Sequence, residues 1–74
     1  MNELLELLAE INEDVDFQNE TALIDDGIID SLDLTGLIAE MENAFDIDIE
    51  MNDIVPENFN TVAAMWAMVE RLQG

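Results

Sequence analysis

The chain has 74 residues, half of them hydrophobic, so it is predicted to form one small domain whose single core is only marginally sufficient. Nineteen acidic residues face one basic residue, Arg71, and the formal net charge is −18. A surface of this sign repels nucleic-acid phosphates and anionic lipid, so we expect no nucleic-acid partner and a preference for proteins with basic patches.

Composition also limits the chemistry. Cysteine, histidine, tyrosine and lysine are all absent, which excludes disulfides and thiolate metal sites and leaves little equipment for catalysis. The acidic runs lack the glycine that a calcium-binding EF-hand loop requires at its sixth position, so no metal site is expected. The start of the chain has no secretory signal, and no apolar run is long enough to span a membrane. We therefore expect a cytoplasmic, non-enzymatic monomer with residues 1–74 as its one domain.

Hydrophobic periodicity predicts the first helix over residues 2–12, with Asn2 as its N-cap and a stripe of apolar side chains at Leu4, Leu5, Leu7, Leu8 and Ile11. Residues 13–30 show no sustained period. They are predicted to form a long loop in which apolar residues such as Phe17 and Leu23 lie between polar ones. Loops of this length in small domains are usually functional or held down by their own apolar side chains, and we expect both here.

The second helix is predicted over residues 31–45, with its buried stripe at Leu34, Leu37, Ile38, Met41, Ala44 and Phe45. Its opposite face carries Leu32 and a few small residues, with carboxylates at the edges. Residues 46–50 alternate apolar and polar, but a lone five-residue strand would have no partner, so an extended connector is predicted.

Residues 52–58 are predicted to hold one short helical turn, capped by Asn52 and disturbed by Pro56. The last helix is predicted over residues 61–72, started by Asn60 or Thr61. Its inner stripe consists of Val62, Met65, Trp66, Val69 and Leu72. The fold class is therefore all-α, a small four-helix bundle with a long loop between helices 1 and 2 and a short third helix.

Ser31 is the only serine of the chain, and it stands where the long loop becomes the second helix. A serine at a helix start is commonly just an N-cap, although Asp30 could cap equally well. The alternative is that its hydroxyl is an attachment point, since a helix start favours a phosphate ester.

Asp30-Ser31-Leu32, preceded by Gly27-Ile28-Ile29 and followed by an acidic helix ending Phe45-Asp46-Ile47-Asp48-Ile49, resembles the acyl carrier protein family. The resemblance extends over essentially the whole chain. It implies a phosphopantetheine cofactor attached covalently to Ser31 by a partner transferase. The chain would then carry an acyl or aminoacyl group as a thioester between a loading enzyme and an acceptor enzyme.

The same resemblance implies a partner-recognition surface around Ser31. Its residues are Asp30, Leu32, Asp33, Glu40 and Glu42, where Leu32 is an exposed apolar anchor and the carboxylates contact basic patches. Each role has a purely structural alternative. Leu32 could pack under the long loop against Ile28 or Ile29, and the carboxylates could be only a solvated helix face.

Many fatty-acid-type carriers have a carboxylate five residues after the serine, where this chain has Gly36. That difference disfavours recognition by a standard fatty-acid synthase. The Gly-Ile-Ile-Asp-Ser-Leu form of residues 27–32 and the Glu57-Asn58-Phe59-Asn60-Thr61 lead into the last helix resemble carriers paired with an adenylating enzyme, including D-alanyl carriers, more than fatty-acid-synthesis carriers. Polyketide or other specialised pathways stand as a third alternative. The competing class is a non-carrier acidic module that binds a basic protein, with Ser31 only a cap.

Overall fold

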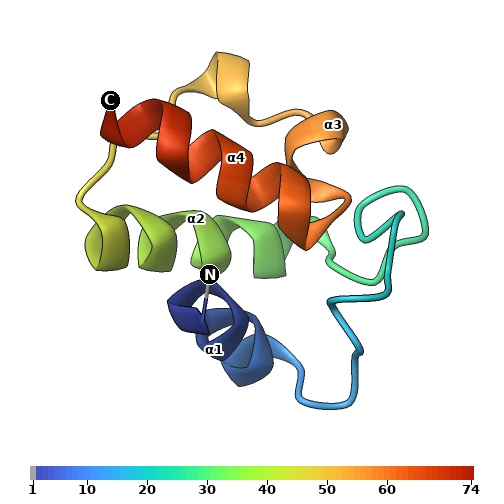
Figure 1. The fold of residues 1–74 in the computed structure, drawn as a ribbon. Helices are drawn as coiled ribbons and strands as arrows, with labels where there is room; N and C mark the ends of the chain where they lie inside the picture. Colours follow the sequence, from blue (N-terminus) through green and yellow to red (C-terminus); the bar gives the residue numbers. More distant parts are fainter. Residues whose placement is uncertain (1) are drawn as a thin grey trace.

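The structure, a computed structural model, describes residues 2–74, and every regular element among them is helical (Figure 1). The elements in chain order are α1 (Asn2–Ile11), α2 (Ser31–Phe45), the 3₁₀ turn η1 (Met51–Asp53), α3 (Pro56–Phe59) and α4 (Val62–Gln73). The predicted all-α architecture, with a long first loop and a short third helix, is confirmed.

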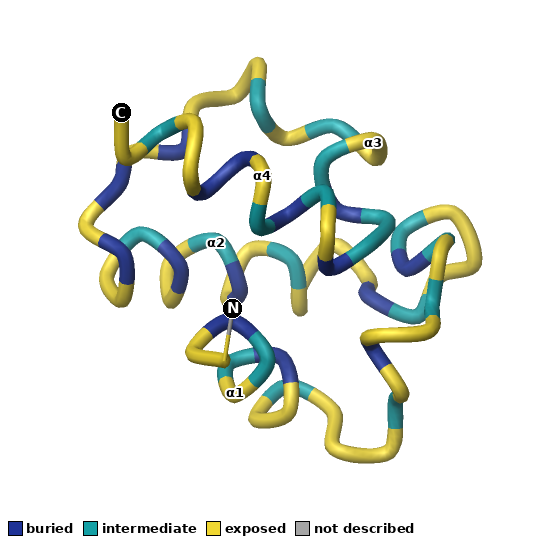
Figure 2. The backbone as a smooth tube through the Cα atoms, in the orientation of Figure 1, coloured by how far each residue is buried: buried dark blue, intermediate teal, exposed yellow. Residues whose placement is uncertain are grey.

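The core lies where α1, α2 and α4 meet, and each helix contributes the apolar stripe predicted from its period (Figure 2). Leu4 and Leu8 of α1 are fully buried, as are Leu37 and Met41 of α2. Phe45 at the end of α2 packs edge-on against Trp66 of α4, with ring centroids 5.7 Å apart and an interplanar angle of 75°. This is a favourable geometry for an aromatic pair.

The long loop also contributes to the core. Phe17, Leu23 and Ile29 are buried among the helical side chains although they belong to no helix. In Figure 1 the loop leaves α1, curves around one side of the bundle and returns to the start of α2. The prediction that its own apolar side chains hold this loop down is confirmed, and this matters because the loop ends at Ser31.

The connector after α2 forms no strand, as predicted, although it begins with Asp46 in a left-handed conformation (φ 54°, ψ 52°). Beyond Asp46, Ile47 and Ile49 are buried and Asp48 and Glu50 are exposed. The prediction for the next segment was wrong in two details. Asn52 caps no helix, and Pro56 does not disturb α3 but begins it. Proline suits a first helical position because its missing N–H would have no partner there and its φ angle is already helical.

Three smaller expectations also differ. Asn2 is already helical, so it does not precede α1 as a cap. Ala44 is exposed although it follows the period of the buried stripe, because its short side chain faces a hollow at the end of the bundle. On α4, Met68 is fully buried, whereas Trp66 and Leu72 are only partly buried.

Candidate functional site

Ser31 is the first residue of α2, and the residue before it is the N-cap. Asp30 has extended backbone angles, and its Oδ1 accepts the backbone N–H of Asp33 at 2.8 Å. The capping role that a serine often fills is therefore taken by the neighbouring aspartate. Ser31 is exposed, and its hydroxyl makes no hydrogen bond among residues 2–74; the Thr35 hydroxyl donates to the Ser31 carbonyl oxygen at 2.9 Å.

The loop before Ser31 is fastened to the far end of the chain by Asn60. The Oδ1 atom of Asn60 accepts the backbone N–H groups of Ile24 at 2.9 Å and Asp25 at 3.1 Å, and its Nδ2 donates to Asp25 Oδ2 at 3.1 Å. The Asn60 carbonyl also accepts the N–H of Leu23 at 3.0 Å.

The loop then returns on itself through a bond from Ile29 N–H to the Leu23 carbonyl at 2.9 Å. Gly27, at the tip, has φ of +72°, a left-handed conformation that glycine adopts at little cost. Together these bonds fix the backbone directly before the cap of α2. Asn60 was predicted only as one of two helix starts; Thr61 takes that role, accepting the Ala64 N–H at 3.0 Å.

Leu32 follows Ser31 and is 81% exposed, so the alternative that it tucks under the long loop is wrong. Asp33, Gly36, Ala39 and Glu40 are exposed as well. The face of α2 next to Ser31 is therefore one leucine with small residues behind it and carboxylates along it.

The five predicted recognition residues are not equivalent in the structure. Leu32, Asp33 and Glu40 are exposed. The carboxylates of Asp33 and Glu40 accept no hydrogen bond among residues 2–74. The Asp30 side chain is occupied as the cap of α2. Glu42 is half-buried, and its Oε2 accepts the backbone N–H of Ile49 at 3.0 Å, so it fastens the connector to α2.

The exposed face of α2 carries no basic residue. Arg71, the single basic residue, lies on α4, where its Nη2 is 3.4 Å from Asp53 Oδ1 of η1. The last turn of α2 contains no basic residue. Within the part of the chain that the structure describes, no helix is long and apolar enough to cross a membrane.

Comparison with known proteins identifies the fold family. A family model described as "Phosphopantetheine attachment site" matches residues 2–69. The chain belongs to this family. It is therefore a carrier rather than an enzyme: it holds an acyl or aminoacyl group on a covalent phosphopantetheine arm and passes it between enzymes.

Curated relatives agree with the family assignment. The D-alanyl carrier protein of Streptococcus uberis is 38% identical over 61 residues, which cover 82% of this chain and 77% of the relative. The D-alanyl carrier proteins of Streptococcus pyogenes serotypes M5 and M49 are each 36% identical with the same coverage.

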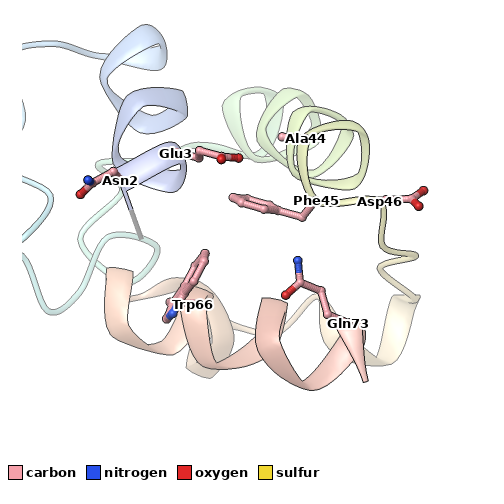
Figure 3. Close-up of a pocket in the computed structure, with 7 residues that line it drawn as sticks. All are labelled: Asn2, Glu3, Ala44, Phe45, Asp46, Trp66 and Gln73. Atoms are coloured by element: carbon pink, nitrogen blue, oxygen red, sulfur yellow. The ribbon is translucent and has the colours of Figure 1, made fainter.

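A second feature of the carrier is a hollow of about 450 Å³ at the other end of α2 (Figure 3). It is lined by Asn2 and Glu3 of α1, by the residues at the end of α2 (Ala44, Phe45, Asp46), and by Trp66 and Gln73 of α4. At 1.5 Å per residue, the fourteen steps from Ser31 to Phe45 place this hollow roughly 21 Å along the helix from Ser31. It is therefore not part of the surface around Ser31.

Proposed function

We propose that Ser31 is the residue to which the phosphopantetheine arm is attached, and that the cargo is an aminoacyl group, D-alanyl in particular. One observation carries the choice of residue: the one serine of the chain presents an exposed hydroxyl at the first position of α2, with the capping role already taken by Asp30. When bound, the arm supplies a thiol on which the cargo is held as a thioester.

The residues at the start of α2 fit such a phosphate ester. Backbone N–H groups at a helix start lack partners within the helix, and the positive end of the helix dipole favours an anion there. Asp30 and Asp33 oppose a second negative charge, so the dipole does not account for the site alone. The fastened loop adds the remaining part, because it holds the Ser31 backbone in one place for a visiting transferase.

The cargo follows from the relatives and from Gly36. The relatives matched over most of the chain are named as D-alanyl carriers. Gly36 occupies the position at which many fatty-acid-type carriers have a carboxylate, so an enzyme that requires this charge would find none.

The partners we propose are a phosphopantetheinyl transferase, an adenylating enzyme that loads the aminoacyl group, and an acceptor enzyme. Each must reach Ser31, so each must contact the same face of α2. The exposed side chains of Leu32, Asp33 and Glu40 are best placed for this contact. The carboxylates of Asp30 and Glu42 also accept backbone hydrogen bonds within the carrier. We further propose that residues 1–74 act as one carrier domain, because α1, α2, α3 and α4 all contribute to a single core.

Attachment at Ser31 is tested with the purified apo chain, coenzyme A and a phosphopantetheinyl transferase. Intact-mass spectrometry should show one added arm on the wild type and none on Ser31→Ala. Thr35→Ala is the matched control, because it removes the hydroxyl one turn further along the same exposed helix. An unchanged adduct on Ser31→Ala would refute the assignment.

The cargo is tested separately on the arm-bearing chain. With D-alanine, ATP and the adenylating enzyme of a D-alanylation system, we expect a thioester adduct that hydroxylamine releases. Loading should be slower with L-alanine and absent when acyl-adenylating or fatty-acid-synthesis enzymes replace this partner. Efficient loading with malonyl or long acyl groups and none with D-alanine would refute the D-alanyl cargo while leaving Ser31 as the attachment site.

A further inference from the structure

The hollow at the C-terminal end of α2 combines features that suit a cation. Figure 3 shows the Glu3 side chain reaching from α1 toward α2, the rings of Phe45 and Trp66 between the helices, and the Gln73 amide directed inward from the end of α4. The Asp46 carboxylate points away from the centre and lies at the rim.

The C-termini of α2 and α4, which are the negative ends of their helix dipoles, also lie at this hollow. Phe45 is the last residue of α2 and Gln73 the last of α4, and both line it. The carbonyl groups at a helix C-terminus have no partners within the helix, and the dipole there favours positive charge. The last turn of α2 has no basic residue, and Arg71 in the last turn of α4 is paired with Asp53 instead. The positive pole of α1 also lies here, but Glu3 stands in its first turn.

The aromatic pair supplies the second, independent feature. Trp66 is only partly buried, although it packs edge-on against Phe45, so part of its indole borders the hollow. An aromatic face attracts a cation that has shed part of its water, and indole is the best of the side chains for this. A hydrated metal ion gains little from such a face, so the lining favours an organic cation.

We propose that this hollow binds the guanidinium group of an arginine side chain presented by a protein partner. A planar guanidinium can stack on the part of Trp66 that borders the hollow while its N–H groups donate to the Glu3 carboxylate. The net charge of −18 draws such basic partners toward the carrier. Because the hollow lies at the opposite end of α2 from Ser31, a partner held here leaves Ser31 free. This inference does not depend on the attachment residue or the cargo.

The test uses the apo chain and the fluorescence of Trp66, the only tryptophan, at constant ionic strength. The probe is N-acetyl-arginine amide, which presents an arginine side chain as a protein does. Its neutral isostere is N-acetyl-citrulline amide. We expect a saturable change with the arginine probe and binding at least about tenfold weaker with citrulline, the factor that one charge-assisted hydrogen bond supplies.

Matched variants locate the site. Glu3→Gln should weaken binding of the arginine probe severalfold, whereas Glu6→Gln, which removes an exposed carboxylate from the same helix outside the hollow, should not. Equal weakening by both variants would mean that the arginine probe only screens the acidic surface diffusely, and it would overturn the proposal. So would a change in Trp66 fluorescence with sodium chloride equal to the change with the arginine probe. N-acetyl-arginine with a free carboxylate that binds more tightly than the capped probe would overturn the protein source, since its carboxylate should be repelled by this chain.

Discussion

Asn60 is predicted to be the residue that holds the loop before Ser31, and Asn60→Ala should loosen that loop without disturbing the helices. The substitution removes two accepted bonds and one donated bond while leaving the backbone bond to Leu23 intact. The amide of Ile24 is partly buried, so losing its partner costs about 1.5 kcal/mol. The two contacts at Asp25 are exposed, and water replaces them at a cost of about 0.5 kcal/mol.

The total of about 2 kcal/mol corresponds to a fall in Tm of roughly 8–16 °C for a domain of this size. The loss is measured by urea or thermal unfolding. Its location is measured by hydrogen exchange, which should speed up at Ile24, Asp25 and Ile29 before it does in α2. Asn52→Ala is the control, because Asn52 is exposed and its side chain makes no hydrogen bond among residues 2–74.

Exchanging the two side chains, Asn60→Asp together with Asp25→Asn, keeps the net charge and separates the loss of these hydrogen bonds from a general effect of changing residue 60. Asn60→Asp alone sets a second carboxylate against Asp25, whose Oδ2 lies 3.1 Å from the present Nδ2 atom, and should destabilise at least as much as alanine. Adding Asp25→Asn returns a donor to the pair and should recover most of the loss. No recovery in the double variant, or unchanged loop exchange in Asn60→Ala, would refute the reasoning.

Three further outcomes are expected. Raising sodium chloride from about 0.01 to about 0.15 M shortens the screening length from about 30 to about 8 Å, so Tm should rise; magnesium should raise it further, and a flat or falling Tm would contradict self-repulsion. Asp30→Ala should cost about 1 kcal/mol because it removes the cap of α2, whereas Ser31→Ala should change stability little; equal losses would show that the capping assignment is wrong. Leu32→Ala should leave the free energy of unfolding within about 0.5 kcal/mol of wild type yet raise the KM of the transferase for this carrier. The buried Leu37→Ala should instead lower the free energy of unfolding by about 2–5 kcal/mol. An unchanged KM with Leu32→Ala would show that Leu32 is not an anchor.

The helices were predictable because burial repeats locally. α2 begins and ends at the predicted residues, α1 ends one residue before the predicted end, and α4 begins and ends one residue later than predicted. The place of Ser31 at the start of α2 was also visible in the sequence, whereas its interpretation as an attachment point came from the family resemblance of Asp30-Ser31-Leu32. The exposure of Leu32 followed from its position opposite the buried stripe of α2, and the structure confirms it.

What the sequence did not reveal depends on tertiary contacts that no local pattern records. Asn60 binds a loop 35 residues earlier, and Glu42 accepts an N–H from a connector whose path is set by tertiary packing. Neither bond has a local signature, because asparagine and glutamate are ordinary surface residues at those positions. The exposure of Ala44 has the same origin: the period placed it correctly on the helix, but whether a neighbour covers it depends on where α1 begins and α4 ends.

The charge of this carrier acts at two ranges. None of the carboxylates of residues 2–74 is fully buried, so their repulsion acts mainly through water and is screened. At an ionic strength of about 0.15 M, charges separated by more than about 8 Å act weakly on one another. Asp33 is two residues from Ser31 along α2, about 3 Å of helix rise, whereas Glu40 is nine residues away, about 14 Å. Asp33 can therefore act on a basic group approaching Ser31 itself. Glu40 can act only on a partner that extends along α2 and contacts it directly. Of the recognition residues we propose, Asp33 and Leu32 therefore suit every enzyme that reaches Ser31, and Glu40 suits those that cover the length of the helix.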